Sequence, residues 1–263
     1  MRIRTLIEKE FIDLARNRSA LLPVVLVTVM SLVLPFGIAV VVPWLTGRGL
    51  GHDADLVKVS EAASVHGRLS NDASVQLFLF QQFLMLFLLT PITGAMALAA
   101  HAIVGEKQAR TLEPLLATPI TTFELLTAKV VGALVPTIAI SLVGLALYAG
   151  GILVFAEPGV AAAMLSTRTL MLVAVVTPAA ALVSLQAAIL ISSRVNDPRT
   201  AQQFGVLIII PLTGVLVAQF TGTVWLSAAS LGLGGLGLLV LWALLALLSV
   251  AVFERESILT RWR

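Results

Sequence analysis

The sequence has 263 residues, of which 59% are hydrophobic and only 12% are Asp, Glu, Lys or Arg. Water-soluble globular proteins average about 45–50% apolar and about 25% charged residues, so the composition excludes an ordinary soluble enzyme and indicates a polytopic membrane protein. The net charge of +3 is too small to suggest nucleic-acid binding, and the absence of cysteine excludes disulfides and thiolate metal sites.

Residues 1–18 are expected to form an amphipathic helix. Its apolar side chains share one arc of a helical wheel: Ile3, Leu6, Ile7, Phe11 and Leu14. Basic residues recur every seven positions on another arc: Arg2, Lys9 and Arg16. This pattern is typical of a helix that lies in the membrane interface before the first span. A solvated tail is the alternative interpretation.

Membrane spans are predicted from the stretches without Asp, Glu, Lys or Arg, which are 19–47, 73–105, 130–156, 169–193 and 200–253. A span needs about 20 residues, so the first four stretches hold one span each. The fifth has room for two, separated by small and polar residues at 221–230. The sequence therefore predicts one all-α domain over 1–263, with six transmembrane helices at about 21–44, 76–102, 125–155, 169–192, 203–220 and 230–252.

The orientation follows from the distribution of basic residues. Thirteen of the 17 lysines and arginines lie on the side of the N-terminus, and four lie on the other side. Positive charge accumulates on the cytoplasmic side of membrane proteins. Both termini are therefore expected in the cytoplasm, and the protein is expected to be a multi-pass protein of the cell membrane.

The predicted spans carry almost no ionisable side chain at mid-membrane depth. Lys129 lies near the cytoplasmic start of the third span and is expected to snorkel towards water. A stand-alone channel or secondary carrier would normally need buried charges, which makes it a weaker alternative. A membrane enzyme acting on lipid is the other alternative, with His101 and Glu106 as its acid–base candidates. No catalytic residue, cofactor or metal is predicted.

Two apparent ligand motifs favour structural interpretations. The run 232–237, GLGGLG, matches a dinucleotide fingerprint but lies in an apolar helix without a preceding strand, so close helix packing explains it better. In the outer segment, His52, Asp53, Asp55 and His66 have irregular spacing, which favours a solvated loop over a metal site. No phosphate-binding loop occurs in the sequence, so ATP hydrolysis would require another subunit.

The segment between the second and third spans indicates a partner. It is charged at its start, and Leu112, Leu115 and Leu116 fall at i, i+3 and i+4, which places them on one face of a short helix. An apolar face in the cytosol requires a binding surface; docking on the chain's own bundle is the alternative. Thr121 and Glu124 then predict a capping box at the start of the third helix.

Residues 105–129, GEKQARTLEPLLATPITTFELLTAK, resemble the segment after the second helix of type-2 ABC transporter permeases. Residues 9–18, 193–203 and 253–262 resemble further segments of that family in the expected order. The resemblance implies a permease subunit of an ATP-driven exporter. It would pair with a separate cytoplasmic ATPase, as a dimer of permeases on a dimer of ATPases, with a second copy or a paralogue as the other permease.

The resemblance also implies roles for individual residues. The coupling helix that enters a groove of the ATPase would comprise Glu106, Lys107, Thr111, Leu112, Glu113, Leu115, Leu116, Thr118 and Pro119. The first and fifth helices would flank the substrate path between two permeases. Thr213 and Gln219 make the fifth helix more polar than a lipid-facing helix would be, and 221–230 are expected to form a short re-entrant element.

Overall fold

The computed structural model describes residues 2–62, 69–108, 121–195, 197, 200, 203 and 206–252. The part of the chain that it describes is helical and contains no strand, which confirms the predicted all-α class. In chain order the elements are α1 (Arg2–Arg16), α2 (Arg18–Phe36), η1 (Gly37–Val41), α3 (Val42–Thr46), η2 (Leu50–His52), α4 (Ala54–Ala62), α5 (Asn71–Leu86), α6 (Leu89–Gln108), α8 (Thr122–Phe155), α9 (Val160–Met164), α10 (Thr167–Met171), η3 (Leu172–Val176), α11 (Thr177–Arg194), α13 (Val206–Phe220) and α14 (Ala228–Val252).

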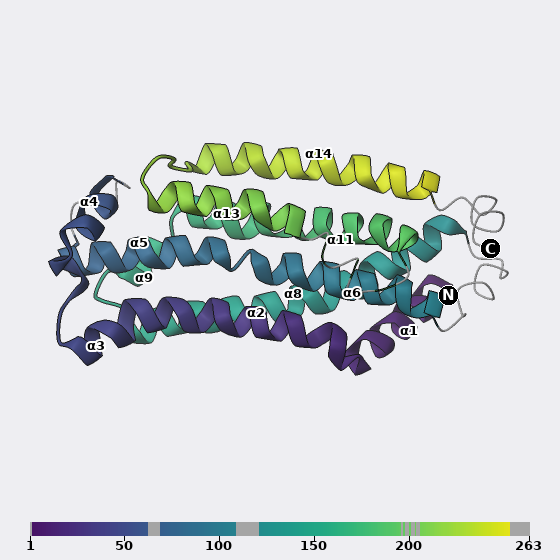
Figure 1. Ribbon diagram of the computed structural model, residues 1–263, viewed down its shortest axis with the longest axis horizontal. Helices are drawn as coiled ribbons and strands as arrows, with labels where there is room; N and C mark the ends of the chain where they lie inside the picture. The colour runs from purple at the N-terminus through teal and green to yellow at the C-terminus, as the bar shows by residue number, and fades with distance from the viewer. Residues whose placement is uncertain are drawn as a thin grey trace.

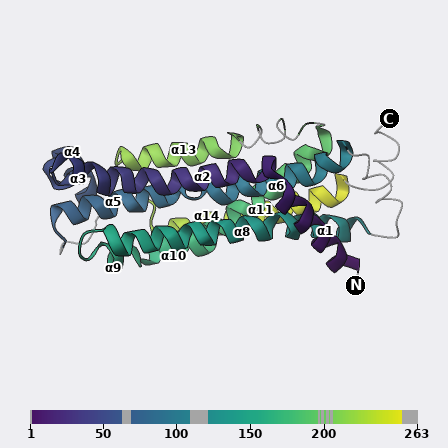
Figure 2. The same cartoon turned by 90° about the horizontal axis from the view of Figure 1, so that it is seen from below.

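The long helices lie side by side in an elongated bundle, with α5 and α6 end to end through its middle (Figure 1, Figure 2). Nearly every side chain from Ala73 to Val104 is buried. The surrounding helices α2, α8, α13 and α14 instead expose large apolar side chains, such as Leu22, Leu153 and Leu233. An apolar outer surface of this extent is what a lipid environment requires, because water would make it unstable.

Five helical segments among the described residues are long and apolar enough to cross a membrane. They are Arg18–Thr46, Asn71–Gln108, Glu124–Phe155, Thr167–Arg194 and Ala228–Val250, and they coincide with five of the six predicted spans. The other predicted span, 203–220, coincides with α13, whose 15 residues rise only about 22 Å at about 1.5 Å each. A hydrocarbon core is about 30 Å thick, so the sixth span remains a prediction.

Two of the spanning segments contain a turn of π-helix next to a proline. The π-turn η1 follows Pro35, and η3 directly precedes the Thr177–Pro178 pair. Proline cannot donate a backbone hydrogen bond, and its ring crowds the preceding turn. A π-turn relieves this crowding, and at the second site Thr177 Oγ1 also donates to the carbonyl of Leu172 at 2.8 Å.

The central segment breaks once, at Phe87 and Leu88, between α5 and α6. The signal in the sequence is Pro91, which lacks the N–H that would donate to the carbonyl of Phe87 in a continuous helix. The backbone N–H of Thr90 donates to that carbonyl instead, at 3.1 Å. The break therefore lies in the most buried part of the molecule, where neighbouring helices hold it in place.

Close packing at Gly235 supports the structural interpretation of the GLGGLG run, although Gly234 and Gly237 have open space around them. A Cβ atom at Gly235 of α14 would come within 2.6 Å of Val175 Cγ1 in η3. At Gly151 of α8, a Cβ atom would come within 2.5 Å of the Phe36 ring. Small residues at these positions let the helix backbones approach each other closely, and any larger side chain would push them apart.

The connection between α3 and α5 is partly helical, which the sequence analysis did not predict. It contains η2 and α4, and Asp72 at the start of α5 accepts a hydrogen bond of 2.6 Å from the backbone N–H of Gly51. His52, Asp53 and Asp55 are exposed there, and His66 lies outside the described residues. Within the described part of the chain, no three His, Asp or Glu side chains gather into a possible metal site.

The N-terminal helix α1 and the C-terminal end of α14 lie at the same end of the bundle (Figure 1). Helix α1 packs against α8, with Leu6 buried and Phe11 and Ile12 exposed. The predicted N-terminal helix is thus confirmed as a helix, while its place in the membrane interface stays a prediction. We use "α1 end" below for this end of the bundle, which is the cytoplasmic end in the predicted orientation.

Candidate coupling site

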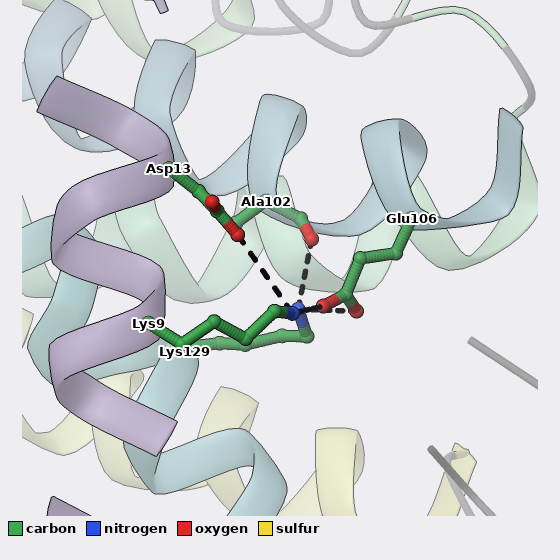
Figure 3. A network of polar contacts seen from close by, with 5 residues as sticks. All are labelled: Lys9, Asp13, Ala102, Glu106 and Lys129. Carbon is green, nitrogen blue, oxygen red and sulfur yellow. Dashed lines mark hydrogen bonds and ion pairs between the residues drawn. The ribbon is translucent and has the colours of Figure 1, made fainter. Parts of the chain in front are cut away.

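Glu106, near the C-terminal end of α6, pairs with lysines from two other helices (Figure 3). Its Oε1 lies 2.5 Å from Lys9 Nζ of α1, and its Oε2 lies 2.7 Å from Lys129 Nζ of α8. Only 11% of the Glu106 side chain is exposed. Asp13 lies at the edge of this cluster, 3.9 Å from Lys9 Nζ. One carboxylate therefore ties α1, α6 and α8 together at the α1 end.

Lys129 is the most buried member of the cluster, with 2% of its side chain exposed. Its Nζ also donates a hydrogen bond of 2.8 Å to the backbone carbonyl of Ala102 in α6. The expectation that Lys129 snorkels to water is therefore wrong, because its ammonium group finds an acid and a carbonyl inside the protein. A buried charge is tolerated only with such partners, so Lys129 depends on Glu106.

Lys107, the next residue along α6, connects to a fourth helix. Its Nζ donates to the backbone carbonyls of Ser192, Ser193 and Val195, at 2.7, 2.9 and 3.1 Å. These carbonyls lie at the C-terminal end of α11, where the last turn lacks intrahelical donors and the helix dipole is negative. Lys107 thus caps α11 and fixes the end of α6 against it.

Helix α8 begins with the predicted capping box. Thr121 Oγ1 accepts a hydrogen bond of 3.1 Å from the backbone N–H of Glu124, and Glu124 Oε2 accepts one of 2.8 Å from the backbone N–H of Thr121. Two unpaired donors of the first turn are satisfied in this way. The described chain therefore ends before residue 109 in the last turn of α6 and resumes at Thr121 with a capped helix start.

The predicted coupling residues divide into two groups. Glu106 and Lys107 belong to the last turn of α6 and contact α1, α8 and α11 of their own chain. The others lie outside the described residues: Thr111, Leu112, Glu113, Leu115, Leu116, Thr118 and Pro119. Whether these bind an ATPase remains a prediction.

The two predicted path residues on α13 have different surroundings. Thr213 is exposed, whereas Gln219 is fully buried, and neither amide atom of Gln219 has a hydrogen-bond partner among the described residues. Gln82 of α5 is buried in the same unpaired way. The ring of Phe220 contacts those of Phe78 and Phe83, with centroids 5.9 and 6.3 Å apart, so the end of α13 packs on α5 close to Gln82.

Sequence reasoning missed the partnership of Lys9, Glu106 and Lys129. One signal was present, because Lys129 interrupts an otherwise apolar run eight residues into α8, and a buried lysine requires an acid. The sequence did not show which acid, since the partners are separated by 97 and 23 positions. Arg168 and its neighbour Gln81 were missed for the same reason.

The alternative of a lipid-modifying enzyme with His101 and Glu106 loses its support. A general base must be available to accept a proton from its substrate. Glu106 instead has a lysine ammonium group on each carboxylate oxygen. The structure therefore assigns this carboxylate to holding helices together.

A comparison with known families agrees with this membrane-helical architecture. The family described as ABC-2 family transporter protein matches residues 4–252. No curated protein matches the sequence. The match covers every helix described above except the first two residues of α1, and the family consists of transport components that are not themselves catalytic. The chain therefore belongs to the ABC-2 family of transporter permeases.

Proposed function

We propose that this chain is the membrane-spanning permease subunit of an ATP-driven exporter, and that residues 109–120 couple it to a separate cytoplasmic ATPase. The observation that carries the proposal is that the described residues on both sides of this segment make firm contacts with the rest of the bundle. On one side, Glu106 and Lys107 connect its start to α1, α8 and α11. On the other, the capping box at Thr121 begins α8 directly after it.

Such anchoring suits a segment that transmits movement. A push on residues 109–120 would act on the end of α6, and through Glu106 and Lys107 it would reach three further helices together. Packed helices respond to such a force by tilting or sliding as rigid bodies, because their interiors are close-packed. ATP-driven closure of the ATPase could in this way alter the contact between two permeases.

We place the contact between two permeases along α2 and α13. Both helices lie on one face of the bundle (Figure 2). Both also expose large apolar side chains over much of their length, including Leu26 and Val33 of α2 and Leu207 and Val217 of α13. Thr213 belongs to the exposed side of α13. The buried amide of Gln219 lies behind it and would reach a substrate path once α13 moves.

The turn between α13 and α14 extends this path in the proposal. Residues 221–227 are not helical, whereas 228–230 belong to α14. The proposed re-entrant element is therefore shorter than the expected 221–230. Trp225 contacts Phe78 of α5, with ring centroids 6.2 Å apart. The turn thus folds back onto the central helix, in the direction that a re-entrant element would take.

The coupling proposal predicts that the variant L112D/L115D loses its ATPase. Two carboxylates in an apolar groove would lack partners, which costs several kcal/mol, more than a transient contact can lose. We expect the variant to insert and purify normally but to fail to co-purify with an ABC ATPase that the unchanged chain retains. Pull-down and stimulation of ATP hydrolysis are the measurements.

The control is L45D/L165D, which changes two exposed leucines (69% and 78%) at the end of the bundle opposite α1. This control should retain the ATPase. If L112D/L115D binds and stimulates the ATPase like the unchanged protein, residues 109–120 are not the coupling element. If neither variant nor the unchanged chain binds any ATPase, the exporter proposal itself fails.

A further inference from the structure

Arg168 is a cation that the mechanism above does not use. It lies in α10, the first turn of the spanning segment Thr167–Arg194, at the end of the bundle opposite α1 (Figure 2). Its side chain is partly buried against α5. Arginine is rare within spanning segments and usually marks a functional contact when it occurs there.

Among the described residues, the guanidinium group of Arg168 has one hydrogen-bond partner. Nη1 donates a hydrogen bond of 3.2 Å to Oε1 of Gln81, which is a neutral amide. Nη2 is buried and has no hydrogen-bond partner. No acidic side chain in the part of the chain that the structure describes forms an ion pair with Arg168. The positive charge is therefore left without a counter-ion.

Two other polar side chains of α5 have their partners within the protein. Gln76, one turn earlier on α5, donates to the carbonyl of Ala39 at 3.0 Å and accepts from the backbone N–H of Glu157 at 2.6 Å. Asp72 accepts from the backbone N–H of Gly51. The same end of α5 thus supplies Arg168 with an orienting amide and leaves its charge for an anion that is not part of the chain.

We propose that Arg168, oriented by Gln81, binds a phosphate group at this end of the bundle. A guanidinium group has a planar set of donors that fits two phosphate oxygens at once, and Gln81 holds one edge of that plane. The position at the start of a spanning helix lies at the depth of lipid headgroups. Both a phospholipid headgroup and free inorganic phosphate present this chemistry, and the inference holds whether or not the chain couples to an ATPase.

The test uses the purified full-length chain in detergent with three probes. Phosphatidylglycerol supplies a phosphate with acyl chains, diacylglycerol supplies the acyl chains without phosphate, and inorganic phosphate supplies the anion alone. Native mass spectrometry measures bound lipid, and thermal unfolding measures stabilisation by each probe. We expect phosphatidylglycerol to bind and stabilise the protein and diacylglycerol to do neither. Stabilisation by inorganic phosphate alone would instead assign the site to the free anion.

The decisive variant is R168Q, compared with R48Q, which removes an exposed arginine after α3 near the same end. R168Q removes the charge-assisted hydrogen bonds to the phosphate, so it should weaken binding of the active probe about tenfold or more. R48Q should leave it unchanged. If R168Q proves unstable, R168K replaces it, because it keeps the charge and loses the planar donors. Equal binding by the Arg168 and Arg48 variants overturns the proposal.

Discussion

At the scale of single residues, the stability of this permease depends on which charged side chains form buried ion pairs. Lys129 and Glu106 are buried within an otherwise apolar bundle, and each compensates the charge of the other. Lys9, by contrast, has 42% of its side chain exposed. Because water screens an exposed pair but not a buried one, the two ion pairs of Glu106 contribute unequally to stability.

This difference predicts an order of destabilisation. E106Q leaves the buried ammonium of Lys129 without a counter-charge, and removal of one partner from a buried pair costs about 3–5 kcal/mol. K129M removes the buried charge itself and leaves Glu106 paired with Lys9, so it should cost less. K9M should cost below about 1 kcal/mol. Thermal unfolding of the purified proteins, followed by tryptophan fluorescence, measures the order.

D13N is the matched control, because Asp13 is exposed and its contact with Lys9 is 3.9 Å long. It should unfold like the unchanged protein. An E106Q variant as stable as D13N would show that the cluster does not hold the three helices together. Its role in transmitting movement from residues 109–120 would then have to be abandoned.

At the scale of elements, α13 differs from the other long helices. It has 15 described residues, fewer than a span requires. Its exposed side carries Leu207, Thr213 and Val217, while Gln219 is buried without a partner. A helix with an unpaired buried amide lacks one favourable contact in this conformation. Gln82 of the central helix α5 is unpaired in the same way, but α13 exposes much of its surface, so we expect α13 to be the helix that shifts during transport.

Cysteine cross-linking tests this assignment with two positions on α13. Single cysteines at T213C should form a disulfide between two copies, because Thr213 lies on the exposed face proposed to meet the partner. Single cysteines at Q219C should not do so in the absence of ATP, because this side chain is inaccessible. Cross-linking of Q219C that appears only with ATPase and nucleotide would report the movement of α13.

Positions on other helices complete that experiment. L153C on α8 and L233C on α14 are highly exposed and lie outside the proposed contact. Efficient cross-linking at these positions together with none at T213C would place the contact between permeases elsewhere. The path proposed along α2 and α13 would then be wrong.

At the scale of the whole molecule, the arrangement has two distinct ends. The α1 end gathers the Glu106 cluster, the Lys107 cap and the start of α8, and the opposite end gathers α3, α4 and α9 (Figure 1, Figure 2). The distribution of lysine and arginine predicts that the α1 end faces the cytoplasm. The proposed function requires this orientation, because residues 109–120 must face a cytoplasmic ATPase.

Accessibility labelling of single cysteines in intact cells tests the orientation. D53C and E157C should react with a membrane-impermeant maleimide from outside, because both native residues are exposed at the end opposite α1. Q108C, D197C and R261C should react only after permeabilisation. The unchanged chain contains no cysteine and is its own background control. Labelling of Q108C from outside would refute both the topology and the coupling proposal.

The sequence by itself determined the class of the protein and the position of most spans. A spanning helix must be apolar over about 20 residues and must satisfy its backbone internally, so each is readable from a local run of residues. The capping box at Thr121 was readable for the same reason, because both partners lie within one turn. The family match over residues 4–252 confirms the resemblance that these local patterns indicated.

Only the tertiary structure decided which helix is central, which charges meet and which polar groups lack partners. Helices α5, α6 and α14 are all predominantly apolar, yet nearly every side chain from Ala73 to Val104 is buried whereas α14 is largely exposed. Lys129 was expected to reach water and instead binds Glu106 and the carbonyl of Ala102. Such contacts depend on how helices far apart in the chain pack together, so they cannot be predicted from the spacing of residues along the chain.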